Sequence, residues 1–202
     1  MGFGEDKVYS VVDQGHQYLD EAIRKVTGDP GELRAKADEC GRCASEVGST
    51  ATSTDQIASN LGQTWRGEAY DSFNGVTTDL TKELIDVLKQ NLEQEKQRLE
   101  QAAQALVSAK SQAQQQKQSF GQQAQQIIQQ MQQAIKAIQG LPDPPVSQGM
   151  KMAMIAAVIM KAFMAAMQAK NSATKAADST MQELSGTLSS LFGQSGTTSV
   201  AA

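Results

Sequence analysis

The sequence predicts an all-α protein: an elongated antiparallel helical bundle built around a helix-turn-helix hairpin with a Trp-x-Gly corner. Apolar and small residues recur every three to four positions along most of the 202 residues, which is the period of a helix with one buried face. Only 4 Pro are present, and Ala, Gln, Lys and Glu are abundant, a composition that favours long helices. Short segments rich in Gly or Pro separate the patterns. We therefore expect a single helical domain over residues 1–192.

The first two helices are predicted over residues 5–27 and 30–62. Gly28 ends the first, and Asp29 with Pro30 begins the second, since Asp is a good N-cap and Pro fits a first helical turn. The second helix carries a narrow stripe with the spacing of a coiled-coil seam. The stripe consists of Leu33, Ala37, Cys40, Ala44, Val47, Ala51, Thr54, Ala58 and Leu61.

The third helix is predicted over residues 68–139. Its first turns continue the stripe, which then shifts sideways, like a stutter in a coiled coil. Gly121 is a plausible break or bend, and residues 127–138 are expected to be well packed. The Gln-rich tract within it can be a disordered, prion-like segment, but its intact heptads favour a solvated helix. The stripe is formed by Ala69, Phe73, Val76 and Leu80, and the shift by Leu84, Val87 and Leu88.

The last helix, over residues 146–192, follows a Gly- and Pro-rich stop and precedes a tail, 193–202, that we expect to be disordered. Its Met-rich start is interrupted by Lys151 and Lys161, so it is not a clean membrane span. One interpretation buries it on most sides in the bundle. The other makes it a surface for a partner or a membrane. The residues of that surface are Met152, Ile155, Ile159, Met160, Phe163, Met164 and Met167.

Several function classes lack support in the sequence. The net charge of −4 argues against nucleic acid as a partner. His16 is the only His, and we find no catalytic set, no metal cluster and no cofactor motif. Cys40 and Cys43 form a CxxC pair that could be redox-active or half a zinc site. Without further ligands or a preceding strand, the two are better explained as small residues of the helix.

Trp65 is the only Trp of the chain, and it lies at the corner between the second and third helices. Gly62 and Gly67 bracket this corner, since Gly adopts backbone angles that other residues avoid. The Trp ring can simply cover the open end of the hairpin, or it can be a recognition residue. The N-terminus has no basic start followed by an apolar segment, so no Sec signal peptide is expected.

A helix, then Trp65-x-Gly67, then a helix that opens Glu-Ala-Tyr-Asp-Ser-Phe resembles the WxG-type substrates of type VII (ESX) secretion systems. The resemblance is best over about residues 30–110. It implies a helical hairpin with the Trp-x-Gly corner, exported without a Sec signal. With its additional helices the chain is similar to the larger PPE and Esp types of ESX-associated protein, although it lacks a Pro-Pro-Glu near its start.

That family uses a secretion signal of the form Tyr-x-x-x-Asp/Glu, which Tyr9 and Asp13 match. The spacing places both side chains on one helix face. The resemblance implies a secreted, non-enzymatic protein recognised through Trp65, Gly67, Tyr9 and Asp13 by a secretion ATPase, a chaperone, a second WxG-type chain or a second copy of itself. Two alternatives remain open: a cytoplasmic coiled-coil scaffold or adaptor, and a membrane-binding protein that uses the Met-rich helix.

Overall fold

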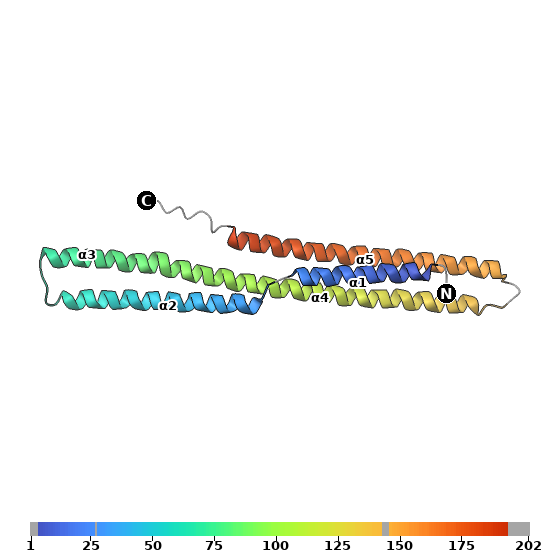
Figure 1. Ribbon diagram of the computed structural model, residues 1–202, viewed down its shortest axis with the longest axis horizontal. Helices are drawn as coiled ribbons and strands as arrows, with labels where there is room; N and C mark the ends of the chain where they lie inside the picture. The colour runs from blue at the N-terminus through green and yellow to red at the C-terminus, as the bar shows by residue number, and fades with distance from the viewer. Residues whose placement is uncertain (1–3, 27, 143–145, 194–202) are drawn as a thin grey trace. The chain divides into compact units, whose positions relative to one another are not determined.

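The computed structural model describes residues 4–26, 28–142 and 146–193 (Figure 1). These residues form helices and contain no β-strand, which confirms the all-α class. Every predicted helix is found, and each begins and ends within two residues of its predicted bounds. Of the predicted tail, only Gly193 is among the described residues. The elements are α1 (Glu5–Lys25), α2 (Pro30–Leu61), α3 (Glu68–Glu83), the π-helix η1 (Leu84–Lys89), α4 (Gln90–Gln139) and α5 (Gln148–Phe192).

The chain divides into two compact units. Unit 1 comprises Met1–Thr27 and Val107–Gly186, and unit 2 comprises Gly28–Leu106 and Thr187–Ala202. Helices α4 and α5 therefore each contribute residues to both units. The expectation that residues 1–192 form a single domain stays a prediction.

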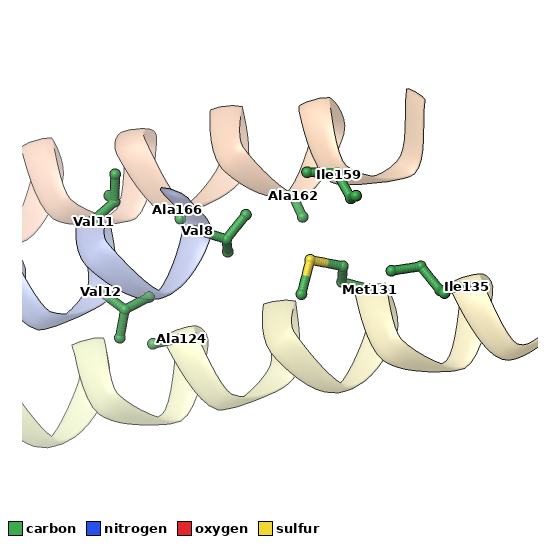
Figure 2. Close-up of a cluster of buried hydrophobic side chains, with 9 residues drawn as sticks. All are labelled: Val8, Val11, Val12, Ala124, Met131, Ile135, Ile159, Ala162 and Ala166. Atoms are coloured by element: carbon green, nitrogen blue, oxygen red, sulfur yellow. The ribbon is translucent and has the colours of Figure 1, made fainter. Parts of the chain in front are cut away.

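Unit 1 is built from α1, the second part of α4 and most of α5, which share one apolar core (Figure 2). Val8 of α1, Met131 of α4 and Ala166 of α5 are each at most 2% exposed. The expected packing of residues 127–138 is confirmed, since Met131, Ile135 and Ile138 are all buried. The core residues drawn in Figure 2 are Val8, Val11, Val12, Ala124, Met131, Ile135, Ile159, Ala162 and Ala166.

A second cluster in unit 1 depends on a close approach between α1 and α4. Phe120 is 2% exposed, and a Cβ on Gly15 would overlap its ring. Gly15 therefore makes room for the ring where no other residue would fit. The rings of His16 and Phe120 also meet in a T-shaped arrangement, with centroids 5.1 Å apart. The break allowed at the neighbouring Gly121 is absent, because α4 continues through it as helix; a bend there stays a prediction.

Among the polar pairs that join the helices of unit 1, two involve shifted pKa values. The Tyr18 hydroxyl donates to a carboxylate oxygen of Asp178 over 2.5 Å, and this hydrogen bond raises the pKa of the Tyr18 phenol because it holds the phenol's proton. Lys117 Nζ lies 2.5 Å from Asp20 Oδ1, and its hydrogen bond lowers the pKa of the Asp20 carboxyl. Both pairs are partly exposed and fix orientation more than they add stability.

Unit 2 contains a helical hairpin in which α2 packs antiparallel to α3 and η1. The buried residues of α2 are Ala37, Ala44, Ala51 and Ala58, which form one column of the predicted stripe. Opposite them, the buried residues of α3 are Thr77 and Thr81. The hydroxyl of Thr81 lies 2.9 Å from Asp55 Oδ1. Small side chains therefore line the contact between the two helices, which agrees with the small residues of the stripe predicted on α2.

A change of register occurs where the stutter is predicted, as the π-helix η1, but Val87 and Leu88 do not carry the shifted stripe, since they are 53% and 45% exposed. A π-turn accommodates one more residue than an α-turn. On the side facing α2, the half-buried positions accordingly step from Leu84 to Lys89 and then to Leu92. The extra residue keeps the start of α4 facing α2 after the stripe has shifted.

Candidate functional site

The corner of the hairpin is shaped by two glycines that act in different ways. Gly67 caps α3 with φ 102° and ψ −176°, a region essentially reserved for Gly. Apart from Gly67 and its two neighbours in the chain, no described residue has an atom within 4 Å of the position its Cβ would take, so its backbone angles alone require Gly. Gly62 instead has φ −64°, which any residue adopts. A Cβ there would overlap the hydroxyl of Tyr70.

Tyr70, not Trp65, closes the end of the hairpin. The Tyr70 side chain is half-buried, and its hydroxyl donates to the carbonyl oxygen of Ala58 over 3.3 Å. Trp65 is 53% exposed, so its ring does not serve as the cap that sequence reasoning allowed. The signal that could have identified Tyr70 is a Gly placed opposite an aromatic residue across a hairpin corner.

The stripe expected to continue inside the hairpin faces solvent instead. Phe73 is 38% exposed, Val76 67% and Leu80 48%, and Ala69 is also exposed. The prediction of a buried stripe is wrong here, because Thr77 and Thr81 lie about a quarter of a turn around the helix and meet α2. We call Ala69, Phe73, Val76 and Leu80 the α3 column. Its spacing of three and four residues is that of a seam for another helix.

Tyr9 and Asp13 lie one turn apart on α1, in unit 1. Tyr9 packs against the core cluster, and its hydroxyl accepts a hydrogen bond from Gln132 Nε2 over 3.0 Å. Asp13 is exposed. Trp65 and Gly67 belong to unit 2, so each unit contains two of the four predicted recognition residues.

Of the seven residues predicted to form a surface on α5, only some are exposed to solvent. Met152, Met160 and Met164 are 59–70% exposed, whereas Ile155, Phe163 and Met167 are half-buried. Ile159 does not fit the prediction: it is 8% exposed, because it points into the core of unit 1 beside Met131 and Ala162 (Figure 2).

The exposure of α5 also corrects the expectation that this helix is buried on most sides. Within the described residues, α5 is the one helix whose length and composition would allow it to cross a membrane. Its most apolar 18-residue stretch has a mean hydropathy of 1.7, and 11% of that stretch is buried. A core helix of this composition would be mostly buried.

The described residues offer little for chemistry. Cys40 and Cys43 are half-buried free thiols on α2. No group of three or more His, Cys, Asp or Glu side chains in the described part of the chain could hold a metal ion. The expectation that the protein has no metal, no cofactor and no catalytic role stays a prediction.

The hairpin and its Gly-dependent corner are the features by which the chain can be compared with known families. Residues 25–111 match the WXG100 family model, described as proteins of 100 residues with WXG. This family marks WXG-type proteins of type VII secretion, whose members often form dimers. The match contains α2, the corner, α3, η1 and the start of α4, and it confirms the resemblance over the hairpin. Neither the search of curated proteins nor that of solved structures returned a match.

Proposed function

We propose that this chain is a non-enzymatic, secreted substrate of a type VII (ESX) secretion system that acts through helix–helix contacts. The WXG100 match over the hairpin supports the assignment to the system. The observation that carries the mode of action is the α3 column. It leaves Phe73, Val76 and Leu80 uncovered at coiled-coil spacing, beside a corner whose Trp65 is 53% exposed.

The α3 column fits a helix of a second WxG-type chain or of a second copy. An exposed apolar row of this kind is stabilised when a partner helix covers it. The small residues between α2 and α3 bury little apolar area, so a partner would add a substantial part of the hairpin's apolar burial. The residues outside the match, in α1, the second part of α4 and α5, make a larger protein related to the PPE and Esp types.

Export is proposed to depend on the two exposed recognition residues, Trp65 and Asp13. Trp65→Ala removes a half-exposed ring and should change the free energy of unfolding by no more than about 0.5 kcal/mol. Asp13→Asn removes one exposed charge and leaves the core contacts of Tyr9 intact. Ile57→Ala is the matched control, because Ile57 is 62% exposed and lies on α2 outside the corner and the column.

The experiment measures each variant in cells and in culture medium of a host with an active type VII system. We expect Trp65→Ala and Asp13→Asn to accumulate in cells while Ile57→Ala is exported normally. Normal export of both folded variants would remove the recognition role.

Pairing is tested separately by sedimentation: Val76→Gln with Leu80→Gln should abolish complexes with a co-expressed WxG-type chain or a second copy. Unchanged complexes would contradict a role for the α3 column.

A further inference from the structure

The solvent-facing side of α5 in unit 1 is apolar over more than four turns of helix. Met150, Met154, Met160 and Met164 are 57%, 43%, 59% and 60% exposed. Ala153 and Ala157, which lie between them, are exposed as well. At about 100° per residue, these six residues lie within one arc of the helix. We call them the outer face of α5; Ile159, Ala162 and Ala166 on the opposite side are buried in unit 1.

Basic residues accompany this face, and acidic residues are absent from it. Residues 148–177 contain four Lys and no Asp or Glu, in a chain whose net charge is −4. Lys161 lies roughly 60° around the helix from Met164, and Lys175 lies almost in line with Met164, three turns further on. Both Lys residues are exposed. The face is therefore complementary to a surface that is apolar beneath and negatively charged at its boundary.

A partner helix fits this face poorly. A helix docked at coiled-coil spacing would have to bury Lys161 and Gln168 in its seam, which costs stability because a charge loses its water there. A second copy would bring like charges together. The seam positions would be Met150, Met154, Ala157, Lys161, Met164 and Gln168.

We propose that the outer face of α5 binds the surface of a bilayer that contains anionic lipid. The helix would lie in the plane of the interface, with Met side chains among the acyl chains and its buried side still packed on unit 1. Lys161 would extend its aliphatic stem along the apolar layer and place its ammonium at the phosphates. Flexible Met side chains suit the irregular acyl region. This interaction is independent of secretion and of the hairpin.

The test uses the full chain and flotation with vesicles of phosphatidylcholine alone or of equal parts phosphatidylcholine and phosphatidylglycerol. We expect binding to the mixed vesicles, weaker binding to neutral ones, and release by added salt. Met160→Gln with Met164→Gln should lower the affinity at least about tenfold. Lys161→Gln with Lys175→Gln should lower it about 25-fold, since each Lys near an anionic surface contributes about fivefold.

Ile57→Gln with Val107→Gln is the matched control, because both side chains are exposed and lie outside α5. It should bind the vesicles as the wild type does. The proposal is overturned if mixed and neutral vesicles bind equally, or if the Met variant binds as well as the control. It is also overturned if sedimentation without lipid reveals a dimer that the Met variant alone dissociates, since the face would then be an interface between copies.

Discussion

Gly67→Ala tests whether the hairpin corner is held by backbone geometry. Gly67 has φ 102° and ψ −176°, and open space surrounds the position of its missing Cβ. The substitution therefore introduces strain without a clash. A non-Gly residue in this region costs of order 1–3 kcal/mol, so we expect the free energy of unfolding to fall by about that amount. In a chain of this size, the thermal midpoint should fall by about 2–4 °C for each kcal/mol.

Gly75→Ala is the matched comparison, because it makes the same chemical change about two turns into α3. Gly75 is helical, and its Cβ position is also open. Ala should stabilise the helix there by about 1 kcal/mol. The measurement is denaturant unfolding of both variants, followed by circular dichroism. A Gly67→Ala protein as stable as the wild type, with Gly75→Ala more stable, would refute the claim that the corner requires a glycine conformation.

Three further outcomes concern unit 1. Gly15→Ala should destabilise by about 1–3 kcal/mol in the same unfolding assay, because its Cβ would displace the buried Phe120 ring; an unchanged midpoint would contradict the close approach. Ile159→Ala should cost about 2–5 kcal/mol through the cavity it leaves, and a loss below 1 kcal/mol would mean that Ile159 is not buried. Tyr18 should ionise at higher pH than an ordinary Tyr, since the bond to Asp178 raises its pKa. The stability from that bond is present below the unfolded pKa and is lost as pH rises through the folded pKa. Ultraviolet titration of the wild type and of Tyr18→Phe measures the ionisation of the Tyr side chains. The prediction is refuted if the phenol that the substitution removes ionises in the ordinary range of a Tyr.

The positions of the helices could be predicted from the sequence, but the side of each helix that is buried could be predicted less well. Asp29 with Pro30 marks the start of α2, and Gly67 the start of α3, through local chemistry that tertiary packing does not alter. The side of α3 that meets α2 depends on a comparison that hydrophobicity cannot make. Thr77 and Thr81 are buried because small side chains let α2 approach closely, whereas larger apolar residues beside them stay outside.

The candidate site follows the same division. The need for Gly67 was predictable, because positive φ has a residue-level signature. The roles of Trp65 and Tyr70 were not, because both are aromatic residues near one corner. Tyr70 takes the capping position because its ring occupies the space beside Gly62 that a Cβ would otherwise fill. Ile159 was assigned to the surface with its Met neighbours because an apolar helix with few charges reveals no polar face from which its orientation could be read.

The π-helix η1 makes the chain unequally tolerant of changes in length. Deleting one residue within Leu84–Lys89 would convert the wide turn into an ordinary α-turn and leave Leu92 and the residues after it facing α2. The same deletion in α4 between Phe120 and Met131 would rotate Met131 by about 100° relative to Phe120. Met131, which is 2% exposed, would then leave the core of unit 1. The segment 84–89 is thus a point at which the hairpin can lose a residue while the long helix keeps its phase.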